Sequence, residues 1–132
     1  EIRQLEQLCK TIEENISEDK LEIRARADIE FHIKLVELGG NRFMSKVMQL
    51  LRRPMMLHMT ESVPREEDIR SHRKIVEAIK SRDRDRVLKE ICVHCERGLQ
   101  TAIYYLARRK EQGFGSTVDS TTDFEKAHFM SG

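Results

Sequence analysis

The stretch ARADIEFHIKLVELGGN, residues 25–41, decides the fold because it has the apolar repeat of a helix. Within that repeat lies an unusual pair of polar residues. Its apolar residues recur at the spacing of an amphipathic helix, and the glycine pair at its end supplies the left-handed backbone that terminates helices. Asp28 and His32 lie four residues apart, on the face that should meet a core. A carboxylate and an imidazole therefore occupy positions where apolar side chains belong.

The composition points to one helical domain without a membrane span. The chain has 132 residues, of which 36% are charged and only 5% aromatic, a balance that favours helices over strands. Its 24 basic and 23 acidic residues nearly cancel, so there is no basic excess of the kind that nucleic-acid-binding domains carry. No apolar run reaches about 20 residues, and three cysteines cannot all pair within the chain. We therefore expect a cytoplasmic protein with no membrane partner.

Hydrophobic periodicity predicts five helices and no strand, which we expect to form an antiparallel all-α bundle. The first two helices span about residues 2–15 and 19–38. The third follows an Asn41 cap, and its apolar residues are Phe43, Val47, Leu50 and Leu51. The fourth runs from about Pro64 to Lys80, and the fifth runs from an Asp83 cap to about Lys110. Residues 1–112 should form the bundle, and residues 113–132 should form a flexible tail.

Two further histidines also lie within core-facing stripes. His72 is in register with Ile69, Val76 and Ile79 in the fourth predicted helix, and His94 is in register with Val87, Ile91, Gly98 and Ala102 in the fifth. Any one buried histidine is commonly satisfied by a backbone carbonyl, and that interpretation stays open for each of them. Ionisable groups in the stripes of three helices are explained together by one shared metal ion.

The donor set fits such an ion. Two side chains at positions i and i+4 lie one helical turn apart and can bind a single cation. Imidazoles with one carboxylate suit zinc, which we expect first, or nickel, iron(II) or manganese. Four protein ligands could close a tetrahedral structural site, whereas a larger coordination number would leave positions for water or for a small molecule.

Two segments together resemble a known family. DIEFHIKLVELGGN, followed by SHRKIVEAIKSRDRDRVLKEICVH, resembles the C-terminal effector-binding (FCD) domain of FadR-type members of the GntR family of bacterial transcription regulators. The resemblance covers about residues 1–106. The residues that match its pattern in order and spacing are Asp28, Phe31, His32, Asn41, His72, Ile75, Ala78, Ile79, Asp83 and His94.

The resemblance implies a metal-dependent sensor and no enzymatic activity. It implies a divalent metal held by Asp28, His32, His72 and His94, with a cavity beside it for a small organic acid whose carboxylate completes the coordination shell. It also implies a homodimer that responds to this effector. The family's N-terminal winged helix-turn-helix domain, which binds DNA, has no counterpart here, and neither does the first helix of the effector domain. We therefore expect a fragment of a domain that has six to seven helices when intact.

Three further residues are candidates for effector binding. Arg24 and Arg97 lie one turn from Asp28 and His94, and guanidinium groups pair well with carboxylates. Asn41, in the Gly-Asn of the pattern, is the third candidate. For both arginines the alternative is an ordinary solvated side chain.

Other interpretations remain. An all-α metalloenzyme could use the same three histidines and aspartate if coordination positions stay open, and a structural zinc could simply hold the bundle together. Cys92 and Cys95 flank His94 but point away from it on a helix, so we interpret them as small packing residues.

Overall fold

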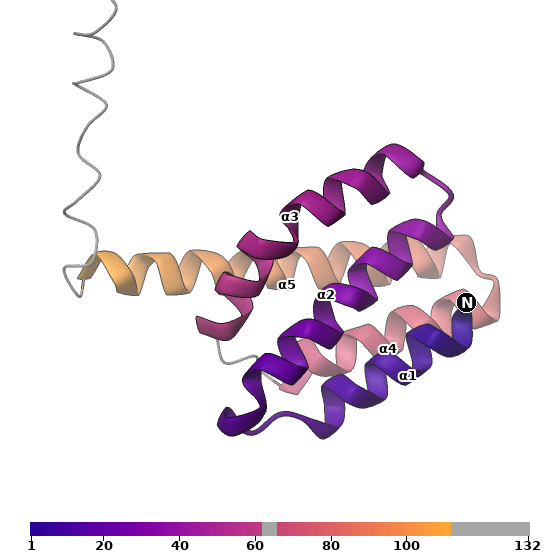
Figure 1. Ribbon diagram of the computed structural model, residues 1–132. Helices are drawn as coiled ribbons and strands as arrows, with labels where there is room; N and C mark the ends of the chain where they lie inside the picture. The colour runs from indigo at the N-terminus through magenta and orange to yellow at the C-terminus, as the bar shows by residue number, and fades with distance from the viewer. Residues whose placement is uncertain (62–65, 112–132) are drawn as a thin grey trace, which may run out of the picture. The chain divides into compact units, whose positions relative to one another are not determined.

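The computed structural model describes residues 1–61 and 66–111, and within these ranges it contains helices and no strand. The elements in chain order are α1 (Ile2–Glu14), a short 3₁₀ helix η1 (Glu18–Lys20), α2 (Leu21–Leu38), α3 (Arg42–Glu61), α4 (Glu66–Ser81) and α5 (Arg84–Glu111), as Figure 1 shows. The predicted all-α helical bundle is confirmed. Pro64 and the predicted tail lie outside the described residues. Among the described helices, none has the length and apolar character needed to cross a membrane.

Helix ends are fixed by the residues that the sequence indicated. Gly40 has a φ of 73°, the left-handed conformation that glycine adopts without strain, and it ends α2. The side-chain oxygen of Asn41 accepts a hydrogen bond from the N–H of Met44 at 3.1 Å, which caps α3. The carboxylate of Asp83 accepts one from the N–H of Arg86 at 3.0 Å and caps α5 in the same way.

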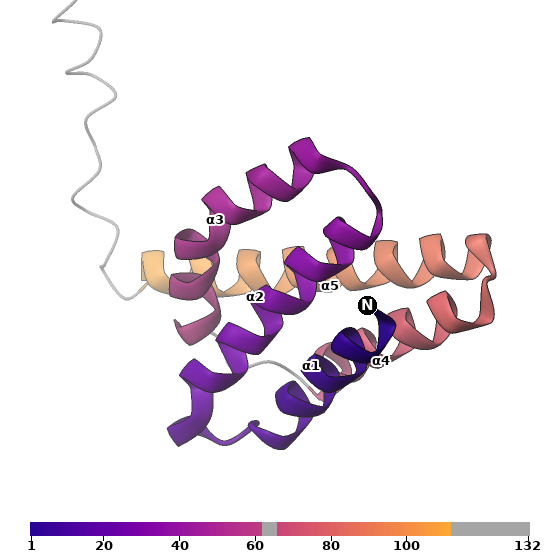
Figure 2. The same cartoon turned by 45° about the vertical axis from the view of Figure 1, so that its right-hand side comes forward.

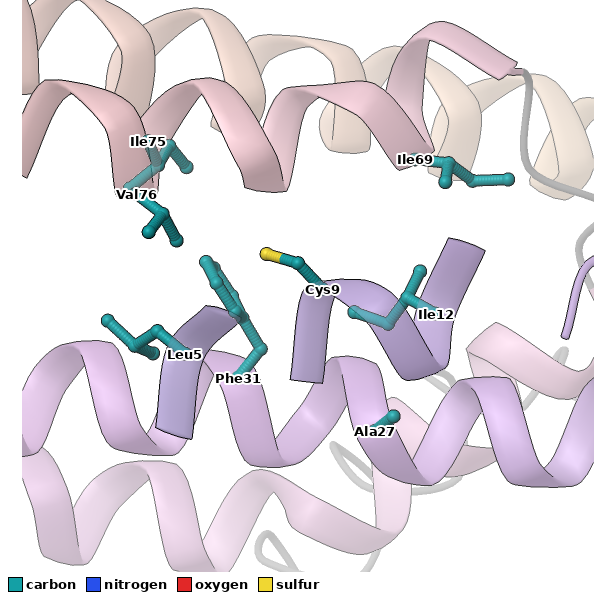
Figure 3. Packing of buried hydrophobic residues seen from close by; sticks show 8 residues of the cluster. All are labelled: Leu5, Cys9, Ile12, Ala27, Phe31, Ile69, Ile75 and Val76. Atoms are coloured by element: carbon teal, nitrogen blue, oxygen red, sulfur yellow. The ribbon is translucent and has the colours of Figure 1, made fainter. Parts of the chain in front are cut away.

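The apolar core lies where α1, α2 and α4 meet. Helix α2 packs against α1 and α3, and α1 packs along α4, as Figures 1 and 2 show from two directions. Phe31 is fully buried and reaches from α2 into the cluster (Figure 3). The other buried members are Leu5, Cys9, Ile12, Ala27, Ile69, Ile75 and Val76. Each Å² of apolar surface removed from water stabilises this cluster by about 25 cal/mol, and this contribution does not depend on the charge of neighbouring side chains.

Helix α3 buries less of its apolar surface than α1 or α2. Phe43, Leu50 and Leu57 are 73%, 80% and 60% exposed, although they recur every seven residues. Single exposed apolar residues are ordinary, but these three form a repeating apolar stripe on one helix. Periodicity thus predicted the helix correctly, and the other described helices leave that stripe exposed.

The three cysteines are free thiols. Cys9 belongs to the core, where burial raises the pKa of its thiol to about 12 and keeps it protonated. Cys92 and Cys95 are exposed, so the interpretation of these two as packing residues is wrong. Helix α5 faces the bundle with Ile91 and His94, and the two cysteines lie on other sides of the helix.

The chain divides into two compact units, with the boundary inside α5. Residues 1–101 form the first unit, which contains the core, the histidines described below and the first part of α5. The second unit begins at Ala102, and its described part is the remainder of α5.

Candidate metal centre

Three helices bring their histidines to one place. His32 lies on α2, His72 on α4 and His94 on α5. One nitrogen from each ring lies within 4.8 Å of the other two. The ring centroids are 5.5 Å apart for His32 and His72, 5.0 Å for His32 and His94, and 4.6 Å for His72 and His94. Side chains far apart in the sequence thus meet closely enough to be candidate ligands of one ion.

Asp28 contacts two of these rings from one helical turn before His32. Its Oδ1 lies 3.1 Å from Nδ1 of His32 and 3.2 Å from Nε2 of His72. Burial would raise the pKa of this carboxyl group, but His72 and His32 outweigh that effect and hold the pKa well below its usual range. The carboxylate is therefore ionised, and it places a negative charge beside the imidazoles.

His32 is oriented by its own helix. Its Nδ1 lies 2.8 Å from the main-chain carbonyl oxygen of Asp28, as well as near the carboxylate. Both of these oxygens only accept hydrogen bonds, so Nδ1 carries the hydrogen. Burial lowers the pKa of His32, yet the hydrogen bond and charge of Asp28 prevail and raise it above the ordinary value. Its other nitrogen, Nε2, points at His94.

His94 is held in its neutral form. Its Nε2 lies 2.8 Å from Nε2 of His32, and its Nδ1 lies 2.7 Å from Oγ of Ser71. Burial, followed by the charges of His72 and His32, lowers its pKa to about 3. A neutral ring offers a lone pair, so one of the two facing Nε2 atoms can accept a hydrogen bond from the other.

His72 lies on the border between the cluster and the core. It is buried, and its Nδ1 lies 3.3 Å from the carbonyl oxygen of Ile69. The ring of Phe31 meets it edge-on, with centroids 4.8 Å apart, and meets His32 at 5.8 Å. The same phenylalanine that fills the core therefore also forms an apolar wall of the polar cluster.

These residues fit a divalent cation. Zinc–nitrogen bonds of 2.0–2.1 Å in a tetrahedron place ligand atoms roughly 3.3 Å apart. The imidazole nitrogens lie within 4.8 Å of one another, with one pair at 2.8 Å, so side-chain adjustments of an ångström or so bring them to that spacing. The lone pairs of the imidazole nitrogens would bind a cation, and Asp28 would balance its charge. The donors, imidazole and carboxylate, are those that zinc, nickel, iron and manganese accept.

The three predicted effector-binding residues lie in different surroundings. Arg24 is buried, and its Nη2 donates to the carbonyl oxygen of Met59 at 3.3 Å, which ties α2 to α3. Asn41 is exposed and caps α3. Arg97 is half-buried, forms an ion pair with Glu67 at 3.4 Å, and adds to the electrostatic lowering of the His94 pKa. Arg97 thus acts electrostatically on the cluster, and the effector role of all three residues stays a prediction.

Ser71 was not among the predicted site residues. It precedes His72 and is 4% exposed. Its Oγ contacts Nδ1 of His94. A signal was present, because Ser71 is in register with Ile75 and Ala78, two fully buried residues of α4. A serine inside a second buried stripe is the same kind of anomaly that identified the histidines.

One surface groove, of about 490 Å³, lies between α1 and α4. It is lined largely by charged side chains that pair with each other or with neighbours, among them Glu13, Arg70, Arg73 and Glu77. Its lining includes none of the four predicted metal ligands. The effector cavity that we expect beside the metal therefore stays a prediction.

Comparison with known proteins places the chain in a family. Residues 1–97, which contain all of the clustered histidines, match the FCD domain. Comparison with curated proteins and with solved structures gave no significant match. The chain therefore belongs to the FCD domain family, the ligand-binding regulatory domain at the C-terminal end of GntR-family transcription regulators.

Proposed function

We propose that this FCD domain binds one divalent metal ion, zinc first among the candidates, and uses it to sense a small organic acid. The ligands would be Asp28, His32, His72 and His94. The proposal is carried by one observation, that two imidazole Nε2 atoms face each other at 2.8 Å beside a third imidazole and an ionised carboxylate. When bound, the metal would supply a Lewis acid that selects a carboxylate.

The chain's own residues prepare this site. The acceptors at Nδ1 of His32, His72 and His94 hold the rings in place, and such outer partners are a regular feature of metal-binding histidines. The wall formed by Phe31 limits ring movement on the core side. Arg97 brings positive charge near the site, which would favour an anionic effector.

We further propose a homodimer of a FadR-type regulator that works in the bacterial cytoplasm. The exposed apolar residues of α3 at seven-residue spacing, Phe43, Leu50 and Leu57, support a helical partner surface. Effector binding would change the dimer and thereby DNA binding by an N-terminal domain outside this chain. It can do so only if the effector binds one of the two arrangements more tightly than the other.

Metal content tests the site directly. Elemental analysis of purified protein should find about one metal per chain in the wild type, and both His72→Ala and His94→Ala should lose the metal and melt at a lower temperature. His58→Ala is the matched control, since this half-buried histidine lies on α3 outside the cluster. Metal content that survives both cluster substitutions would contradict the assignment.

The sensing role is tested by a thermal-shift screen of small carboxylic acids on the metal-loaded domain. A sensed acid should raise Tm in the wild type, lose its effect in His72→Ala, and be recovered unchanged after incubation. An acid that is consumed would instead support the metalloenzyme interpretation.

A further inference from the structure

The hydroxyl group of Ser71 joins helix α4 to His94 of α5. Ser71 is buried, and its Oγ hydrogen-bonds the main-chain carbonyl of Asp68, one turn earlier on α4. The same oxygen lies 2.7 Å from Nδ1 of His94. One hydroxyl therefore serves two polar partners in an interior position.

The count of hydrogens assigns the direction of both bonds. A serine hydroxyl has one hydrogen, and a carbonyl oxygen can only accept. Ser71 consequently donates to Asp68, and its oxygen accepts from an N–H at Nδ1 of His94. In a neutral ring the other nitrogen, Nε2, then carries no hydrogen and has a free lone pair. This nitrogen is the atom that faces His32.

We propose that Ser71 is a positioning residue that fixes the tautomer and the ring orientation of His94 for metal binding. This inference rests on the proposed metal site. His32 and His72 are held at Nδ1 by carbonyl groups of their own helices, from Asp28 and Ile69. His94 is instead held by a side chain of another helix, so α4 controls a ligand that α5 supplies.

Two variants test the role of the hydroxyl, with zinc as the probe. Ser71→Ala should weaken zinc binding on the order of 10- to 100-fold, the usual cost of losing such an outer partner. Ser71→Thr keeps the hydroxyl and should restore most of the affinity. Zinc affinity is measured by competition with a chromophoric chelator.

The chain offers a matched control on the same helix. Ser81 donates to the carbonyl oxygen of Ala78 at 2.7 Å, three residues earlier, as Ser71 does to Asp68. Ser81 differs because it is exposed and its hydrogen bond involves no histidine. Ser81→Ala should therefore bind zinc as the wild type does, which separates a general helix effect from control of His94.

Nitrogen NMR of the metal-free protein reports the tautomer of His94, which would not change if the role of Ser71 were merely structural. Long-range ¹H–¹⁵N spectra should show His94 protonated at Nδ1 in the wild type and in Ser71→Thr. In Ser71→Ala, His94 should lose that preference, while His32 and His72 keep their signals. Because the wild-type spectrum alone can contradict the assignment, the test stands even if Ser71→Ala does not fold.

The outcomes separate the two proposals. Protonation of wild-type His94 at Nε2, or a Ser71→Ala variant with wild-type zinc affinity and an unchanged His94 tautomer, would overturn the role of Ser71. Wild-type protein that binds no zinc would overturn the metal site and with it this role in metal binding. If the wild type binds zinc and only Ser71→Ala is weakened, both proposals stand.

Discussion

Phe31 and His32 are neighbours on α2, yet they belong to two regions with different physics. Phe31 is buried in an apolar cluster with α1 and α4, and His32 contacts Asp28 and His94 in a polar cluster with α4 and α5. The first region is stabilised by area removed from water. The polar cluster depends on the protonation of its side chains, because a carboxylate and an imidazole stabilise each other only when their charges or hydrogen-bonding roles are complementary.

The difference extends to how each helix is held. Helix α4 serves both regions, with Val76 in the core and His72 in the cluster. Helix α5 has Ile91 packed against the core, contacts both α2 and α4 through His94, and also pairs with α4 through Arg97 and Glu67. We therefore expect metal removal to affect the attachment of α5 more than the packing of the core.

The largest effect should come from the residue shared by both regions. Phe31→Ala leaves a cavity in the core and removes the apolar wall of the cluster, so it should lower the free energy of unfolding by about 3–5 kcal/mol. Ile23→Ala is the control on the same helix, because Ile23 is 51% exposed, and it should change stability by no more than about 1 kcal/mol. Denaturant unfolding measures both, and equal losses would break the distinction between the two sites.

Metal removal should lower the stability of the domain and loosen the polar region more than the core. At free zinc 100 times above Kd, the ion adds about 2.7 kcal/mol to stability, and a chelator should remove that amount. Amide hydrogen exchange should then speed up in the first part of α5 more than in α1. His72→Ala should be insensitive to the chelator. A uniform loss of protection over α1 and α5 would contradict the proposed separation.

The negative charge of Asp28 should contribute more to zinc affinity than its hydrogen bonds do. Asp28→Asn keeps the shape but removes the negative charge, and it should weaken zinc binding by at least about tenfold, or 1.4 kcal/mol. Glu30→Gln is the control on the same helix, since Glu30 pairs with Arg52 away from the histidines. Isothermal titration measures both affinities, and equal weakening would show that Asp28 acts only through the net charge of the domain.

The smallest effect should come from the rim of the core. Arg73 on α4 pairs with Glu13 on α1 through two hydrogen bonds, one of 2.7 Å, but both side chains are partly exposed. Arg73→Ala should therefore cost less than about 1 kcal/mol. The loss should shrink further in high salt, which unfolding curves at two ionic strengths would reveal. A loss like that of Phe31→Ala would mean that charge, and not apolar burial, holds α1 to α4.

Local patterns predicted the helices well because helix formation depends on neighbours in the chain. The caps at Asn41 and Asp83 and the left-handed Gly40 were predicted from residue type alone. The start of the second helix was predicted near residue 19, and the structure places a 3₁₀ helix at Glu18–Lys20 before α2 begins. Such shifts are ordinary, since terminal turns change hydrogen-bonding pattern at little cost.

The sequence by itself determined which positions break the apolar stripes, and therefore which side chains meet inside the bundle. Only the tertiary structure decided how they meet. The facing Nε2 atoms belong to residues that are 62 positions apart in the sequence. Ser71 of α4 contacts His94 of α5, and Arg24 is buried against Met59. These contacts depend on the relative placement of helices, which side-chain packing fixes and no local repeat encodes.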